Sequence, residues 1–144
     1  MFCTFYERLI QYYETDKMGC VHHSNYIRWF EEARTKWLEE TGFGYSRVEQ
    51  MGFMIPVLEA EAKYIAMTHF AETVIIEVSL EKYTGSKASF CYQVTNKETG
   101  KLCCTGRTQH CFLNSEGKPV SLKRAIPQLH DFCTKALEKA DLER

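Results

Sequence analysis

Residues 12–37 constrain the fold most, because a short polar loop there leads directly into a helix with one heavily aromatic face. Tyr26, Phe30, Ala33 and Trp37 follow one another at spacings of four, three and four. This spacing places all four on one side of a helix with about 3.6 residues per turn. So apolar a face must be buried, and we therefore expect this helix to pack against the apolar side of a sheet.

The expected start of this helix brings functional groups to its N-terminus. Ser24 or Asn25 supplies the N-cap side chain, and Gly42 ends the helix at about residue 41. The free N–H groups and the positive end of the helix dipole favour developing negative charge at this point.

Each polar residue of the preceding loop allows more than one interpretation. Asp16 is either an exposed turn residue or cap before the helix, or a carboxylate that attacks a carbonyl or activates water. Gly19 either completes a turn or lets a ligand approach the backbone closely. His22 and His23 are adjacent, so we expect them to point in different directions, and either can simply cap or pack. Cys20 beside them suggests a metal site, but no second ligand pair with zinc-like spacing is present, so we expect no metal.

Length, charge and cysteine content restrict the class of protein. The 144 residues fit one domain, 1–144, and a hydrophobic content of 44% is enough for a sizeable core. A formal net charge of -1 argues against non-specific nucleic-acid binding, which needs a strongly basic surface. We expect neither a signal peptide nor a membrane span. With an odd count of seven cysteines, these features predict reduced thiols and a cytoplasmic location.

From residue 57 onward the hydrophobic period changes from about 3.6 to about 2, which is typical of strands. The strand expected at 57–64 has one solvated face, and the short turns between consecutive strands imply an antiparallel sheet. Pro127 fits the first turn of a final helix. The expected order is strand 2–13, the long helix, a short helix at 45–51, strands 57–64, 73–80, 88–95 and 101–113, and the C-terminal helix.

Residues 12–34 resemble the hotdog-fold acyl-CoA thioesterases, specifically the 4-hydroxybenzoyl-CoA thioesterase branch, and are similar to its Tol-Pal-associated members. The branch pattern is a T-D-x-x-G-x-V loop, then an aromatic or histidine pair, then N-Y-x-x-W-F-E-x-A-R. The loop, the pair and the helix start read here Thr15-Asp16-Lys17-Met18-Gly19-Cys20-Val21, His22-His23 and Asn25-Tyr26-Ile27-Arg28-Trp29-Phe30-Glu31-Glu32-Ala33-Arg34. The match is specific because loop, spacing and helix all agree, and it weakens after residue 64.

The resemblance implies an α+β hotdog fold, in which a five-stranded antiparallel sheet wraps around the long central helix and a C-terminal helix follows. It implies that protomers join edge to edge into a homodimer or homotetramer, with active sites between two protomers. The substrate is then an acyl-CoA or acyl-carrier-protein thioester. No cofactor is expected, because CoA is part of the substrate.

The same resemblance assigns roles within the loop. Asp16 is the nucleophile, which gives a mixed anhydride, or the general base that activates water in one step. The backbone N–H of His23 polarises the thioester carbonyl, as donors at a helix N-terminus can. The His23 side chain is expected to assist. The other residues expected to contact substrate are Gly19, Val21, His22 and Tyr26.

Lys63, Lys87 and Arg107 are candidates to bind the CoA phosphates, because they interrupt the faces of predicted strands, although such residues are commonly only solvated. Three functions remain open: an acyl-CoA thioesterase, an acyl-carrier-protein thioesterase on the same fold, and a non-catalytic module that binds acyl-CoA or a partner protein. The intact set of Asp16, Gly19 and His23 favours an enzyme, since a pure binder has no need of the acid.

Overall fold

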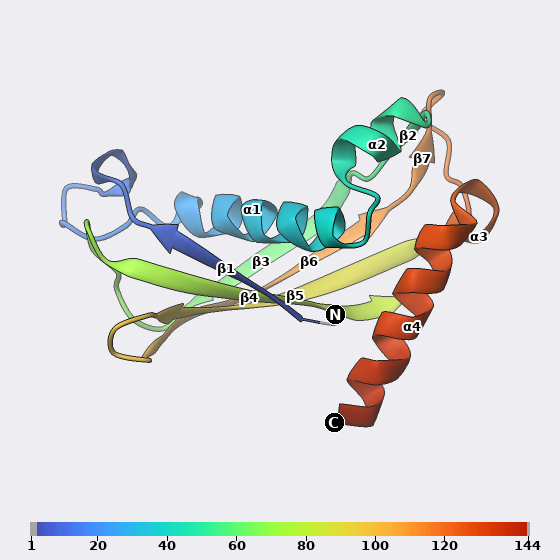
Figure 1. Cartoon of the computed structure of the whole chain (residues 1–144). Helices are drawn as coiled ribbons and strands as arrows, with labels where there is room; N and C mark the ends of the chain where they lie inside the picture. The colour runs from blue at the N-terminus through green and yellow to red at the C-terminus, as the bar shows by residue number, and fades with distance from the viewer. Residues whose placement is uncertain (1–2, 144) are drawn as a thin grey trace.

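The computed structural model describes residues 3–143, so the expected domain 1–144 and the expected first strand from residue 2 both extend beyond the described part. Five strands form one antiparallel sheet in the order β1-β4-β5-β6-β3, and the long helix α1 lies across one face of it (Figure 1). This arrangement confirms the predicted α+β fold. The strands are β1 Cys3–Leu9, β3 Val57–Tyr64, β4 Thr73–Tyr83, β5 Lys87–Asn96 and β6 Leu102–Cys111.

The aromatic face of α1, Ser24–Glu40, is buried against the sheet as predicted. Tyr26, Phe30, Ala33 and Trp37 are each at most 3% exposed. Burial of one such large side chain stabilises the fold by roughly 2–3 kcal/mol. The long helix ends at Glu40, close to the expected position.

One glycine of the sheet allows α1 to approach this closely. The Phe30 ring stacks on Tyr92 of β5, with 4.4 Å between ring centroids. A Cβ added at Gly106 of β6 would collide with the Phe30 ring. Gly106 is therefore required by packing, since any larger residue would push the helix away from the sheet.

Short elements lie beyond both ends of α1. The 3-10 helix η1, Tyr12–Glu14, precedes it, while α2, β2, β7 and α3 gather near its C-terminal end (Figure 1). The helices α2, Tyr45–Gln50, and α4, Pro127–Glu143, confirm the two further helices that were expected. The elements η1, β2, β7 and α3 were not expected, because two to four residues are too few to show a period. Within residues 3–143, no helix has the length and apolarity needed to cross a bilayer. The remaining bounds are β2 Phe53–Met54, β7 Leu113–Asn114 and α3 Leu122–Ala125.

Three predicted strand limits are wrong, and the first is that the strand expected at 73–80 continues to Tyr83. The strand expected to run to residue 13 ends at Leu9, and Tyr12 and Tyr13 are 76% and 77% exposed beside the sheet. Aromatic residues favour strands where they pack on the surface of a sheet, whereas the Tyr12 ring packs edge to face against Phe70, a residue outside the strands, with 5.5 Å between ring centroids. The strand expected at 101–113 ends at Cys111, because Leu113–Asn114 pair separately with β2.

Strand β3 is an edge strand that pairs only with β6. One solvated face was expected, but in this single chain the apolar side is open as well, with Leu58 46% and Tyr64 51% exposed. The alternation is present in the sequence, but α1 covers its apolar side only in part, through Tyr26 against Tyr64 and through the core around Ala62.

Candidate active site

The loop between η1 and α1 is a tight turn built around Asp16. The Asp16 N–H donates to the Cys20 carbonyl over 2.9 Å, and the Gly19 N–H donates to the Asp16 carbonyl over 3.0 Å. Gly19 has a φ of 83°, a conformation that favours glycine. A Cβ there would meet nothing within 4 Å. The backbone conformation of the turn therefore explains the glycine at position 19, and close approach of a ligand is not needed to explain it.

The turn fixes one oxygen of the Asp16 carboxylate and leaves the other more accessible. The Met18 N–H donates to Asp16 Oδ1 over 2.9 Å. The Cys20 thiol lies 3.7 Å from Oδ1 and 3.9 Å from Oδ2. Burial, and the Asp16 charge beside it, raise the pKa of the Cys20 thiol. Cys20 therefore acts as a weak S–H donor here, and Asp16 Oδ2 has the fewer contacts of the two carboxylate oxygens.

The start of α1 differs from the prediction that Ser24 or Asn25 caps it. His23 occupies the N-cap position, and no side chain caps the helix from there. The Ser24 N–H donates to Nδ1 of His22 over 3.2 Å, and the Asn25 N–H donates to the His22 carbonyl over 3.0 Å. The Asn25 side chain instead donates to the Glu14 carbonyl over 2.9 Å. Among residues 3–143, the His23 N–H has no acceptor. That amide is therefore open at the helix N-terminus.

The His22 and His23 rings do not point apart as expected but stack, with 4.1 Å between centroids and 30° between planes. The Ser24 N–H can only donate, so Nδ1 of His22 is an acceptor and the ring proton lies on Nε2. The Tyr64 hydroxyl donates to the His23 carbonyl over 2.9 Å. This bond fixes the helix start to the edge strand β3.

Asp16 and His23 line the same pocket, which has a volume of about 290 Å³. The pocket also includes Val21 and Tyr26, two more of the residues expected to contact substrate, whereas Gly19 and His22 lie outside its wall. The Tyr26 hydroxyl is bonded to Thr68 Oγ1 at 2.7 Å, and burial raises the pKa of Tyr26 to about 12. Tyr26 therefore forms a neutral wall. The remaining lining residues are Met18, Cys20, Tyr64, Ile65, Ala66 and Met67.

Glu14 supports this loop, although it was not among the residues predicted from the sequence. Its carboxylate is buried and accepts hydrogen bonds from Arg8 at 3.0 and 3.1 Å, and from the Trp29 indole at 2.9 Å. Its carbonyl accepts the His22 N–H at 2.8 Å. The available signal was an acid directly before the motif, two residues ahead of Asp16, with Arg8 six residues ahead of that acid. Tyr64 was not predicted either, because no local sequence pattern relates the end of β3 to the loop before α1.

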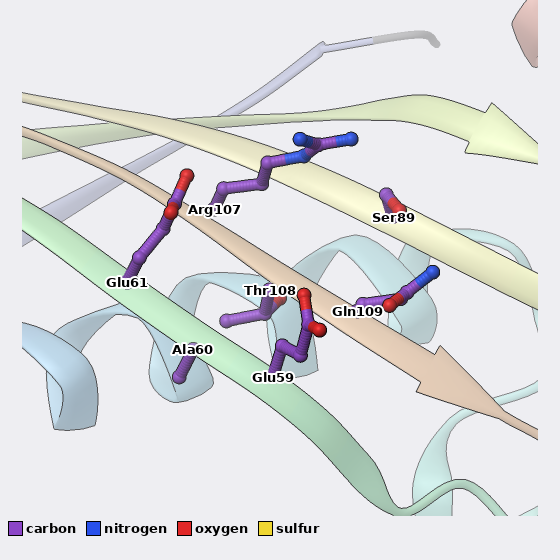
Figure 2. A pocket seen from close by; sticks show the side chains of 7 residues that line it. All are labelled: Glu59, Ala60, Glu61, Ser89, Arg107, Thr108 and Gln109. Atoms are coloured by element: carbon purple, nitrogen blue, oxygen red, sulfur yellow. The ribbon is translucent and has the colours of Figure 1, made fainter.

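The three candidate phosphate-binding cations lie away from this pocket. Lys63 and Arg107 together line a pocket of about 280 Å³ on the face of the sheet opposite α1. Arg107 also faces a neighbouring pocket of about 410 Å³ with Glu59 and Glu61 (Figure 2), and it forms an ion pair with Glu81 at 3.0 Å. Lys87 is exposed at the start of β5 and lines neither pocket.

The cysteines and histidines of the loop have partners other than a metal. The Cys20 thiol contacts Asp16, and Nδ1 of His22 is bonded at the helix start. The part of the chain that the structure describes contains no group of three or more His, Cys, Asp or Glu side chains placed to hold a metal ion. No disulfide bond joins cysteines within residues 3–143.

Comparison with known proteins identifies the family of this chain. The model of the thioesterase-like superfamily matches residues 10–137. YneP of Bacillus subtilis, a putative acyl-CoA thioesterase, is 34% identical over 128 residues, which cover 88% of this chain and 92% of the relative. The acyl-CoA thioester hydrolase YbgC of Escherichia coli is 25% identical over 119 residues, covering 81% of this chain and 87% of YbgC.

A solved structure of a DHNA-CoA thioesterase from Staphylococcus aureus matches with a TM-score of 0.95 and 31% identity, over 100% of this chain and 97% of that chain. A hypothetical protein from Aquifex aeolicus matches with a TM-score of 0.80 and 35% identity, over 87% and 98% of the two chains. The chain therefore belongs to the thioesterase-like superfamily and has its hotdog fold.

Proposed function

We propose that Asp16 is the nucleophile or general base of this chain, and that the His23 N–H binds the thioester carbonyl oxygen. The chain is an acyl-CoA thioesterase, which hydrolyses its substrate to a free acid and CoA. One observation carries the assignment of residues: Asp16 and His23, the N-cap residue of α1, line a single pocket of about 290 Å³.

The proposed reaction uses the two groups in sequence. The carbonyl oxygen accepts the His23 N–H, and the helix dipole stabilises the oxyanion that develops there. Asp16 Oδ2 then attacks the carbonyl carbon, or removes a proton from a water molecule that does so. The carbon–sulfur bond breaks and CoA leaves as its thiolate, which takes up the proton held by Asp16 in the general-base route, or a proton from solvent water after direct attack. After direct attack, water hydrolyses the acyl–aspartyl anhydride. Neither route calls for a cofactor beyond the CoA of the substrate.

The side chains that line the pocket favour a substrate with a flat, apolar acyl group. The Tyr26 and Tyr64 rings meet edge to face, with 5.3 Å between centroids, and Val21 and Met67 lie in the same wall. An aromatic acyl group packs favourably against such rings. The Staphylococcus aureus relative, a DHNA-CoA thioesterase, supports the same class. We therefore propose aromatic acyl-CoAs as substrates, with acyl-carrier-protein thioesters as the alternative.

A second copy of the chain is proposed to complete the site. The edge strand β3 ends at Tyr64, a residue of the pocket wall. Leu58, near the start of this strand, and Ile65 and Met67, just after its end, are also exposed. An exposed apolar edge strand readily pairs with another chain. We propose a homodimer joined through β3, or a homotetramer of such dimers. The free thiols support a cytoplasmic location.

Release of the CoA thiol tests the proposal directly. A panel of aromatic and straight-chain acyl-CoAs, with one acyl-carrier-protein substrate, is followed with a thiol-reactive dye. A blank without substrate corrects for the cysteines of the protein, and Asp16→Asn is the control variant. Rapid release by the wild type and slow release by Asp16→Asn support the assignment. Binding without release, measured by calorimetry, would identify a non-catalytic module instead.

A further inference from the structure

Tyr64, the last residue of β3, donates its hydroxyl proton to the His23 carbonyl over 2.9 Å. Burial raises the pKa of Tyr64, so the hydroxyl keeps its proton near pH 7 and remains a donor. The two residues are 41 positions apart, so the bond exists only in the folded chain. It connects the edge strand β3 to the start of α1, where the proposed oxyanion donor lies.

This bond acts on the peptide unit directly after that donor. The His23 carbonyl and the Ser24 N–H belong to one peptide plane. Side chains hold this plane at both ends, because Tyr64 binds the carbonyl and Nδ1 of His22 accepts the Ser24 N–H over 3.2 Å. The preceding plane contains the open His23 N–H and the His22 carbonyl, which accepts the Asn25 N–H over 3.0 Å. The direction of the open N–H therefore depends on how both planes are held.

The Tyr64 ring is itself restrained by its neighbours, although the residue is 51% exposed. It meets the Tyr26 ring edge to face with 5.3 Å between centroids, and the His23 ring edge to face with 6.3 Å between centroids. Tyr26 is fixed in turn, because its hydroxyl lies 2.7 Å from Thr68 Oγ1. Tyr64 thus has two separable parts, a ring in the wall of the pocket and a hydroxyl that binds the helix start.

We propose that Tyr64 is a positioning residue of the thioesterase reaction, and that its hydroxyl holds the first turn of α1 so that the His23 N–H stays directed at the thioester carbonyl oxygen. The inference rests on the proposed function, since it assigns Tyr64 to the donor proposed there. A donor stabilises a developing oxyanion best when it is oriented before the charge appears. The hydroxyl should therefore act on kcat, whereas the ring, as part of the pocket wall, should act on KM.

Two variants of Tyr64 separate its hydroxyl from its ring. Tyr64→Phe removes the hydroxyl alone, and its kcat on the acyl-CoA that the wild type hydrolyses fastest should fall about three- to tenfold, with KM nearly unchanged. The bond is solvent-exposed, so the variant leaves no buried group without a partner and should fold. Tyr64→Leu also removes the ring, so its KM should rise by about three- to tenfold as well. Tyr12→Phe, at a residue that is 76% exposed, is the matched control and should keep wild-type values.

A double variant tests whether the hydroxyl acts through the His23 N–H. Proline has no N–H, so His23→Pro lacks the donor that Tyr64 is proposed to orient. Adding Tyr64→Phe to His23→Pro should therefore lower kcat by less than about twofold further, because the two changes affect one interaction. If Tyr64→Phe lowers kcat by the same factor with and without His23→Pro, the hydroxyl acts elsewhere and the proposal is overturned.

Circular dichroism and sedimentation of each variant show whether fold and assembly match the wild type, so that a lower kcat is not a loss of structure. A wild-type kcat in Tyr64→Phe, with or without a rise in KM, would overturn the proposal and leave Tyr64 as part of the pocket wall. Failure of the proposed function gives a different result, in which Asp16→Asn keeps a near-normal kcat. If Asp16→Asn stops turnover and Tyr64→Phe does not lower it, only the role of Tyr64 is withdrawn.

Discussion

The indole Nε1–H of Trp29 donates to Glu14 Oε2 over 2.9 Å, which joins the first turns of α1 to the segment before the Asp16 loop. Arg8 of β1 holds the same carboxylate through two bonds, at 3.0 and 3.1 Å. The Glu14 carbonyl accepts the His22 N–H at the other end of the loop. Glu14 thus fixes both ends of the loop, and the geometry of Asp16 relative to His23 depends on it.

Glu14→Gln should destabilise the protein and lower activity. The amide keeps the shape but leaves the largely buried Arg8 without its full counter-charge, at an expected cost of about 2–4 kcal/mol. Urea unfolding measures this cost, and kcat should fall while KM changes little. Glu32→Gln is the matched control: Glu32 also binds Arg8, but its side chain is 35% exposed, so about 1 kcal/mol or less is expected. Equal losses in the two variants would contradict a special role for Glu14.

The sequence predicted the elements whose residues repeat with a period, and it predicted the loop through its motif. The helix α1 could be predicted because a buried helix face requires apolar residues three or four positions apart. Its sequence shows this spacing at Tyr26, Phe30, Ala33 and Trp37. The partners of the loop could not be predicted in this way. Glu14 contacts Arg8 and Trp29 only in the folded chain. Tyr64 binds His23 although the two residues are 41 positions apart in the sequence.

The prediction of the helix cap failed for a specific reason. Ser24 and Asn25 are favourable N-cap residues, but His22 Nδ1 accepts the Ser24 N–H first, and Asn25 is drawn to the Glu14 carbonyl. Tertiary contacts thus replaced a local preference. The sequence also could not predict that Lys63 and Arg107 line one pocket, because this depends on the register of β3 against β6.

Burial of His110 predicts loss of stability in mild acid. Its pKa falls from 6.5 to about 4 on folding, so the unfolded chain binds the proton more readily. The contribution of His110 is fully present above about pH 6.5 and is lost as pH falls towards about 4. The total loss should be about 3 kcal/mol. His110→Asn should flatten the dependence of unfolding free energy on pH in this range, as measured in urea. His22→Gln, an exposed site, should leave the dependence unchanged, and a wild-type slope in His110→Asn would contradict the assignment.

Neutralising Lys63, Lys87 and Arg107 together should raise KM for acyl-CoA and leave kcat largely unchanged. Loss of surface contacts to the CoA phosphates should change KM by about tenfold at low salt and less at high salt. Because Lys63 and Arg107 share a pocket, Lys63→Gln with Arg107→Gln should account for most of the effect. Lys123→Gln, on α3, serves as the control. An unchanged KM in the triple variant would exclude these three residues as phosphate ligands.

The active form should be at least a dimer. Sedimentation of the wild type at micromolar concentration should show no active monomer, because the exposed edge β3 borders the pocket. Leu58→Glu places a charge on this edge and should shift the protein towards monomer, with activity falling in parallel. Phe5→Glu, on the opposite edge strand β1, is the control. A fully active monomer of Leu58→Glu would show that one chain carries the complete site.

Asp16→Asn should stop turnover while the fold survives. Asparagine keeps the oxygen that accepts the Met18 N–H, but an amide is a poor nucleophile and a poor base. The kcat on a good acyl-CoA substrate should fall by at least about 100-fold, the lower range for a positioned general base. KM should change far less, because the acyl pocket and the helix N–H donors remain, which would place the lost interaction in the transition state. Circular dichroism should show a folded protein, since a loop acid before a helix contributes about 1 kcal/mol to stability.

Two variants of His23 separate its side chain from its backbone in the same assay. His23→Ala keeps the open N–H and should cost less than Asp16→Asn. His23→Pro removes that N–H, and the φ of -55° at this position lies within the range of proline, so the helix start can be retained. Its loss in kcat should exceed that of His23→Ala, because the oxyanion then lacks its donor. A folded Asp16→Asn enzyme with near-normal kcat would end the catalytic assignment of Asp16 and leave it as a turn residue before the helix.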